Sequence, residues 1–265
     1  WGYALRIGIP IVPHYLSGII LNQGDRIMID KMVGKTEVAL YGLAYSIGML
    51  VQLFISGMNS ALTPWMYSKI KKGDIRSMRK VLQLLSVVVV GIAVALMLIS
   101  PELVLIFGSP KYREAVYVIP PVAASVFFIF IYNILSMPQF YYEKTQFLMA
   151  ASMAAAGANV VLNFIFIRLF GYIAAGYTTL ACYMLYSVGH YIVSKRILVN
   201  EGIQENLMSP GFLVACSAFL IGASIICNLI FPYRILRYAI LLASAGLVFW
   251  KKELLLKTMA DIRKK

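Results

Sequence analysis

Polar side chains recur at helical spacing inside the long apolar runs of this sequence. In the first run, His14, Gly18, Asn22 and Asp25 stand three or four residues apart, so an α-helix would carry them on one face. Because polar groups are costly within a membrane, this alignment predicts a hydrated cavity between helices. The candidates for lining it, from this and similar stripes, are Arg6, His14, Asn22, Asp25, Tyr45, Gln52, Asn59, Tyr132, Gln139, Asn159, Asn163 and Tyr183.

The stripes also have a purely structural interpretation. Hydroxyl groups and small residues commonly join packed membrane helices, and this accounts for most serines and threonines in the runs. For the carboxamides Gln52, Asn59, Asn159 and Asn163, helix packing and cavity lining both stay open.

Asp25 and Arg26 follow one another where the first apolar run ends. Neighbouring residues on a helix point about 100° apart. We therefore expect Asp25 to continue the stripe, and Arg26 to turn aside toward a neighbouring helix or the lipid headgroups. Asp25 then either locks the helix end or contacts a cation at an outer gate.

Catalytic and metal-binding patterns are missing from the sequence. It contains no HExxH, no GxSxG and no P-loop, and "GSPKYREAV" lacks the P-loop spacing. His14 and His190 are far apart and have no clustered carboxylates, so we predict no catalytic residues, no metal site and no cofactor. The three cysteines lie in apolar runs without a CxxC pattern and are expected to serve packing.

The composition indicates a membrane protein that spans the bilayer several times. Of 265 residues, 61% are hydrophobic and 13% charged, against about half and a quarter in typical soluble domains. The net charge of +13 would suggest a nucleic-acid partner in a soluble protein. Here the lysines and arginines flank apolar runs, so we read them as charges of cytoplasmic loops and expect no nucleic acid.

The predicted fold class is an all-α polytopic membrane protein with about eight transmembrane helices. A spanning helix needs about 20 apolar residues. Lipid cannot satisfy the hydrogen bonds of the backbone, and these windows lack the strict alternation of apolar and polar residues that marks barrel strands, so we predict helices. The eighth window is short, but its flanking Arg237 and Lys251 could reach the interface. The windows are 7–24, 38–68, 81–101, 115–142, 145–167, 169–194, 206–233 and 238–250.

Loop charges predict the orientation. Lysines and arginines concentrate at 69–80, at 195–196 and after 250, whereas the alternate connections carry fewer. The positive-inside rule then places these segments, and both ends of the chain, in the cytoplasm.

Prolines inside the predicted spans are candidate hinges. Each removes a backbone donor and kinks or ends a helix, and broken helices are common where transporters line a cavity. Pro10, Pro13 and Pro138 lie deepest in their runs and are the hinge candidates.

Three ordered segments resemble bacterial polysaccharide flippases of the multidrug/oligosaccharidyl-lipid/polysaccharide (MOP) superfamily. "IGIPIVPHYLSGIILNQGDRIMIDKMVGKTEVALYGLAYSIG" from Ile7 is similar to the first helices of the second lobe. "LNFIFIRLFGYIAAGYTTLACY" from Leu162 resembles the family's Asn-containing helix and Gly turn, with Ala-Ala-Gly in place of the usual Gly-Ala-Ala. "LIFGSPKYREAVYVIPPVA" is similar to a Phe-Gly-x-x-Tyr turn on the periplasmic side.

The resemblance implies a MATE-like architecture and a transport function. Residues 1–198 would be the second six-helix lobe, 199–209 a cytoplasmic loop, 210–252 two additional helices and 253–265 a basic cytoplasmic tail. The first lobe would precede this segment in a longer chain. The family moves undecaprenyl-linked oligosaccharides from the inner to the outer leaflet of the bacterial cytoplasmic membrane by alternating access, for surface polysaccharides such as O-antigen.

This resemblance assigns expected roles to the polar residues. Arg6 is the candidate cation for a pyrophosphate, or else an anchor at the membrane interface. In an ion-coupled exporter of the same superfamily, Asp25, Asn159 and Asn163 would form a monovalent cation site. The residues expected to contact the glycan are Tyr45, Gln52, Asn59, Tyr132, Asn159 and Tyr183.

Two other functions stay open. One is a Na⁺- or H⁺-coupled small-molecule exporter of the same superfamily, because intramembrane carboxylates commonly couple ions to transport. The other is an integral membrane ligase or acyltransferase, which would need a large loop with a base or nucleophile. The longest candidate loop, 195–209, is short and lacks histidine.

Overall fold

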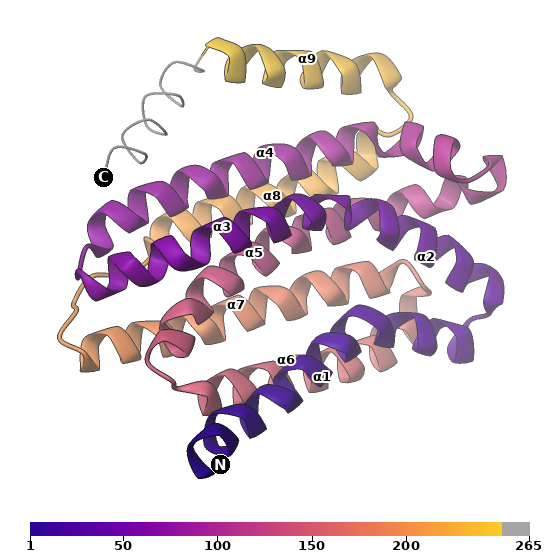
Figure 1. Ribbon diagram of the computed structural model, residues 1–265. Helices are drawn as coiled ribbons and strands as arrows, with labels where there is room; N and C mark the ends of the chain where they lie inside the picture. Colours follow the sequence, from indigo (N-terminus) through magenta and orange to yellow (C-terminus); the bar gives the residue numbers. More distant parts are fainter. Residues whose placement is uncertain (251–265) are drawn as a thin grey trace.

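The computed structural model describes residues 1–250, with the side chains at 3, 4, 6, 7, 10 and 247–250 left out. Every regular element in this part of the chain is helical, which agrees with the predicted fold class (Figure 1). The predictions for Arg6, the side chain of Pro10 and the basic tail lie outside the described residues. The elements are α1 (Gly2–Met32), α2 (Lys35–Gly48), α3 (Leu50–Lys71), α4 (Ile75–Phe107), the 3-10 helix η1 (Pro110–Val118), α5 (Ile119–Tyr141), α6 (Thr145–Phe170), α7 (Ala174–Asn200), α8 (Pro210–Ile230) and α9 (Arg234–Trp250).

Short polar turns separate the helices. Asp74 caps α4 by accepting a hydrogen bond from the backbone N–H of Ser77 at 3.2 Å, and it also pairs with Lys69 at 2.6 Å. Gly171 joins α6 to α7 with a φ of +75°, a backbone conformation that residues with a side chain rarely adopt. The apolar runs therefore end where capping and turn residues stand, as sequence signals predict.

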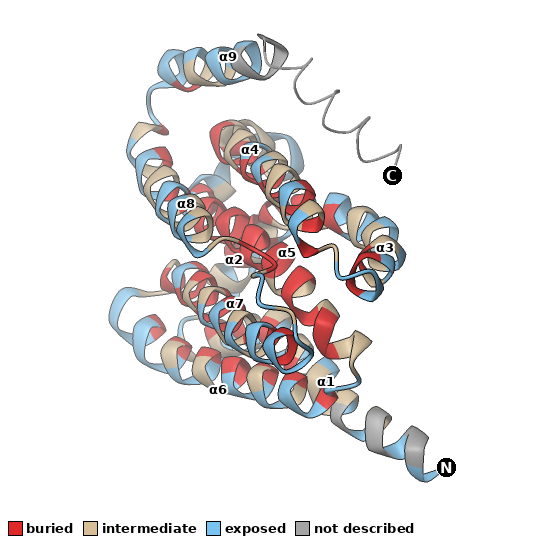
Figure 2. Ribbon diagram, turned by 90° about the vertical axis from the view of Figure 1, so that its left-hand side faces the viewer, coloured by how far each residue is buried: buried red, intermediate tan, exposed pale blue. Residues whose placement is uncertain are grey.

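The α5 helix forms the centre of the bundle. All residues from Ile119 to Ile131 are buried, and α5 packs against α3, α4, α7 and α8 (Figure 2). A second group, α1, α6 and α7, is held together by close α1–α6 and α6–α7 contacts. Since α7 packs against both α5 and α6, it joins the two groups.

Five segments are long and apolar enough to cross a membrane: 35–71, 75–107, 110–141, 145–170 and 210–230. The prediction of about eight spans is therefore supported for five of its windows. The other three windows coincide with α1, α7 and α9, which are helical but fall outside that set among the described residues. Within the part of the chain that the structure describes, the α9 helix has 17 residues.

The second window, 38–68, was predicted as one helix and is instead two. The chain breaks at Met49, and α2 turns away from the line of α3 (Figure 1). No proline stands at this break. A close contact between helices lies beside it, because a Cβ placed on Gly48 would lie 2.7 Å from Val122 Cγ1 of α5.

Replacing Gly48 with valine is expected to lower the thermal stability of the protein. The added Cβ would overlap the side chain of Val122, and overpacking of this kind costs about 1–3 kcal/mol. Gly57→Val on α3 is the matched control, because nothing lies within 4 Å of a Cβ there. The unfolding temperature of the purified full-length protein measures both, and equal temperatures would contradict the packing argument.

The proposed hinge prolines do not interrupt their helices. Pro13 lies within the continuous α1, and Pro138 lies within α5 three residues before its end. Their role as hinges stays a prediction, as do the domain boundaries at 198, 209 and 252.

The α9 helix is fastened to α4 by an ion pair. Arg237 donates from both terminal nitrogens to the carboxylate of Glu102, each at 2.8 Å, and Nη1 also reaches the backbone oxygen of Leu98. Arg237 was expected to reach the membrane interface. In the structure it is buried in a contact between helices, with only 3% of the residue exposed.

Candidate functional site

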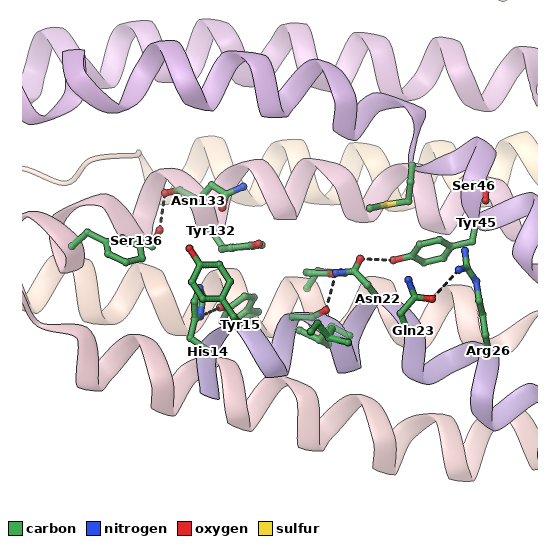
Figure 3. A pocket seen from close by; sticks show the side chains of 17 residues that line it. His14, Tyr15, Asn22, Gln23, Arg26, Tyr45, Ser46, Tyr132, Asn133 and Ser136 are labelled. Carbon is green, nitrogen blue, oxygen red and sulfur yellow. Dashed lines mark hydrogen bonds between the residues drawn. The ribbon is translucent and has the colours of Figure 1, made fainter. Parts of the chain in front are cut away.

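A half-open cavity of about 740 Å³ lies between α1 on one side and α2, α5 and α7 on the other (Figure 3). Polar and aromatic side chains from all four helices reach into it. Its lining residues are His14, Tyr15, Gly18, Ile19, Leu21, Asn22, Gln23, Arg26, Tyr45, Ser46, Met49, Tyr132, Asn133, Ser136, Phe140, Tyr183 and Tyr186.

The α1 helix carries two parallel rows of residues spaced by four. One row, Ser17, Leu21, Asp25 and Ile29, is buried at the interface between helices. The adjacent row, His14, Gly18, Asn22 and Arg26, faces the cavity. Rows with this spacing are the ridges by which helices pack, and here one row packs while the next remains open to a ligand.

Aromatic rings form one wall of the cavity. Tyr132 of α5 stacks on Tyr183 of α7 at 6.3 Å with an interplanar angle of 7°, and its ring centre is 4.5 Å from that of Tyr186. The hydroxyl of Tyr186 lies 3.2 Å from Nδ1 of His14. Such a wall offers flat apolar faces together with hydroxyl groups, which suits a ligand with both C–H faces and polar substituents.

Amide and guanidinium groups line the opposite part of the cavity. The Tyr45 hydroxyl donates to Asn22 Oδ1 at 2.8 Å, and Arg26 Nη1 donates to Gln23 Oε1 at 2.8 Å (Figure 3). The Arg26 guanidinium also lies 5.2 Å from the ring centre of Tyr45. Arg26 Nε is buried and has no hydrogen-bond partner among the described residues, so the guanidinium of this cavity-lining residue is not fully paired.

Asp25 lies behind the cavity wall, fully buried among α2, α6 and α7. Its carboxylate accepts hydrogen bonds from the Tyr41 hydroxyl at 2.5 Å, from Asn163 Nδ2 at 2.5 Å and from the Thr179 hydroxyl at 2.7 Å. Asn163 extends the cluster, since it also donates to Asn159 Oδ1 and accepts from the Thr178 hydroxyl. We call Asp25, Tyr41, Asn159, Asn163, Thr178 and Thr179 the Asp25 cluster.

The cavity brings together five of the predicted candidates and leaves the others elsewhere. His14, Asn22, Tyr45, Tyr132 and Tyr183 line it. The expectation that Asp25 faces the cavity is wrong, because the residue belongs to the buried row of α1. Asn159 and Asn163 are buried with it, and Gln139 is buried beside His190, 2.8 Å from Nδ1.

The α3 helix holds its two candidates away from this cavity. Gln52 and Asn59 are half-buried and do not line it. Their backbone oxygens accept from the hydroxyls of Ser56 and Thr63, so the polar stripe of α3 bonds largely along its own helix.

Arg26 is the cavity-lining residue that the sequence analysis placed elsewhere. It was expected to turn aside, yet it lines the cavity together with Tyr15, Gln23 and Asn133. The spacing of four from His14 through Gly18 and Asn22 leads directly to Arg26, and this signal was present in the sequence.

A family model, MatE, matches residues 10–165, which is more than half of the chain. The chain belongs to the MatE family. The matched segment runs from α1 to α6 and so includes most of the cavity and the Asp25 cluster. MatE proteins are membrane transporters, and this chain is accordingly a multi-pass membrane protein of that transport family.

Two curated relatives come from Haemophilus influenzae. A protein of the Lsg locus is 29% identical over 159 residues, which cover 57% of this chain and 38% of the relative. A membrane protein without a characterised function is 30% identical over 152 residues, covering 54% of this chain and 36% of the relative. The matches thus span less than two fifths of either relative. No solved structure matches the chain.

Proposed function

We propose that this chain forms the second lobe of a flippase that moves a lipid-linked oligosaccharide across the bacterial cytoplasmic membrane. The glycan would occupy the cavity between α1 and α5, and a first lobe in the same longer protein would close its open side. In this arrangement both ends of the segment lie in the cytoplasm, and the lobes rock to expose the cavity to either leaflet in turn.

The chemistry of the cavity wall carries this proposal. A sugar presents C–H faces and a surplus of hydroxyl groups, and the stacked pair Tyr132–Tyr183 with Asn22 and Asn133 offers partners for both. A pyrophosphate linker needs a cation, and Arg26 lines the same cavity with an unpartnered Nε. We therefore assign to Arg26 the role that the sequence suggested for Arg6.

The Asp25 cluster is proposed as the site that couples transport to a monovalent cation. It holds a buried carboxylate with no Lys or Arg hydrogen-bonded or ion-paired to it among the described residues. A buried charge needs compensation, and a proton or Na⁺ can supply it. Rotation of the Asn163 amide would turn its oxygen toward Asp25, and the hydroxyls of Thr178 and Thr179 supply further hard oxygen ligands.

The same cluster favours a second candidate function, a cation-coupled exporter of small molecules. Its cavity would use the aromatic wall for apolar cations or drugs and would not require Arg26. The two candidates therefore differ in the charge of the substrate that the cavity selects.

Deletion and complementation of the full-length gene test the proposal. Deletion is expected to leave lipid-linked glycan on the inner leaflet and to deplete surface polysaccharide, with drug sensitivity unchanged. The measurements are accessibility of the lipid-linked glycan to an external glycosidase and the growth-inhibitory concentrations of several drugs. If the deletion strain shows normal glycan accessibility and a new drug sensitivity, the flippase proposal is wrong and the exporter function is favoured.

A further inference from the structure

A second cavity, of about 680 Å³, lies at the end of the bundle where α4, η1 and the α8–α9 connection meet (Figure 1, right-hand side). This end is opposite to the lysine-rich α3–α4 turn. Its lining residues are Pro101, Glu102, Val104, Leu105, Arg113, Glu114, Val116, Tyr117, Phe231, Pro232, Arg234 and Arg237. We call it the arginine pocket.

Three arginines converge on the arginine pocket from two separate parts of the chain. Arg113 comes from η1, whereas Arg234 and Arg237 come from the first turn of α9. Glu102 and Glu114 also line it, so the lining carries a net charge of +1. Glu102 is already engaged by both terminal nitrogens of Arg237, which leaves the exposed Arg113 and Arg234 facing a single carboxylate.

Arg237 holds an unused donor against this pocket. Only 3% of the residue is exposed, and Nε has no hydrogen-bond partner among the residues that the structure describes. A buried guanidinium with a free donor is costly unless a ligand or water accepts the hydrogen bond. A phosphate oxygen bound in the pocket would supply an acceptor for this donor.

The remaining walls are apolar. Val104, Val116 and Phe231 are buried, and the ring of Tyr117 packs at 5.9 Å against that of Phe231. A small soluble anion would leave these walls unused, whereas a lipid can place its phosphate against the arginines and the start of its chain against the apolar residues. Tyrosine beside arginine is also typical of a membrane–water interface.

We propose that the arginine pocket binds the phosphate group of an anionic lipid at this face of the membrane. Arg113 and Arg234 attract and hold the phosphate, Arg237 Nε donates to one of its oxygens, and the Val104–Phe231 wall accepts the adjoining apolar chain. The site depends on the two C-terminal helices, because α9 supplies two of its three arginines. It is separate from the transport cavity and does not rest on the identity of the transported substrate.

Lipid titration of the purified full-length protein tests this site. The probes are short-chain phosphatidylglycerol, a polyprenyl phosphate, short-chain phosphatidylcholine and inorganic phosphate, with binding followed by native mass spectrometry. The double variant Arg113→Ala/Arg234→Ala is expected to weaken binding of an anionic lipid about tenfold, since two charge-assisted contacts at exposed side chains are lost. It leaves the Glu102–Arg237 pair in place, so the fold should persist.

Two single variants serve as controls. Lys111→Ala removes an exposed charge from η1, and Arg168→Ala removes one from the end of α6, and neither residue lines the pocket. Both should bind like the unchanged protein. Saturable, arginine-dependent binding of phosphatidylglycerol or of polyprenyl phosphate supports the proposal and names the lipid. Equal binding by the double variant, or inorganic phosphate binding as tightly as either lipid, overturns it.

Discussion

Replacing Asp25 with asparagine is expected to reduce transport at least about tenfold and to remove its dependence on the Na⁺ or pH gradient. The substitution keeps the size of the side chain but removes the buried negative charge that a cation or proton would neutralise. The neighbouring donors Tyr41 and Thr179 can still reach the remaining carbonyl oxygen. Flux into vesicles with imposed Na⁺ and pH gradients measures the effect.

The control for this prediction is Asp30→Asn, which changes an exposed carboxylate on the same helix. It should leave flux and its ion dependence unchanged. Asp25→Ala adds a test of the structural role, because it would leave the Tyr41, Asn163 and Thr179 donors without their acceptor, at about 1–3 kcal/mol for each unsatisfied group. If ion dependence is unaltered in Asp25→Asn and Asp25→Ala only lowers the unfolding temperature, Asp25 stabilises the helix packing and does not couple transport to an ion.

The sequence identified the helices well because apolar runs and turn residues act locally. Each of the eight windows coincides with one or two helices in the described part of the chain. The break at Met49 was not predictable in the same way, since no proline or turn motif marks it. Beside the break, Gly48 approaches Val122 closely. The two residues are 74 positions apart in the sequence, so only the packed structure brings them together.

The polar residues of α1 show how a site can be nearly, but not fully, predicted. From Asn22, a step of three turns about 60° back and a step of four turns about 40° forward on an ideal helix. Residues His14, Gly18 and Asn22 are each four positions apart. Arg26 therefore continues their row, whereas Asp25 is rotated out of it in the opposite direction. The sequence shows both steps, and the packing of α6 and α2 against α1 decides which row is buried.

The Asp25 cluster illustrates the complementary case. Asp25, Asn159 and Asn163 were grouped through a family resemblance, and the structure places them together with direct hydrogen bonds. Tyr41, Thr178 and Thr179 complete the cluster from two further helices. Hydroxyl residues are common in membrane helices for packing alone, and the sequence did not assign these three to a site with Asp25.

Replacing Arg26 with glutamine is expected to lower flipping of a pyrophosphate-linked glycan by about tenfold to a hundredfold. Hydrogen bonds to charged groups contribute about 1.5–3 kcal/mol, and each 1.4 kcal/mol corresponds to about tenfold. Glutamine retains polar atoms in the cavity but cannot neutralise a phosphate. The measurement is translocation of a labelled pyrophosphate-linked oligosaccharide by the full-length protein in proteoliposomes.

The matched control is Arg168→Gln, because Arg168 is exposed and lies over the ring of Phe164, away from the cavity lining. It should flip the glycan normally. Arg26→Lys restores the charge without the planar fork of donors, and we expect it to recover part of the activity. If Arg26→Gln flips the glycan as fast as the unchanged protein, Arg26 does not bind the linker. If the protein instead exports an uncharged drug and Arg26→Gln leaves that efflux unchanged, the cavity serves the exporter function, which does not require Arg26.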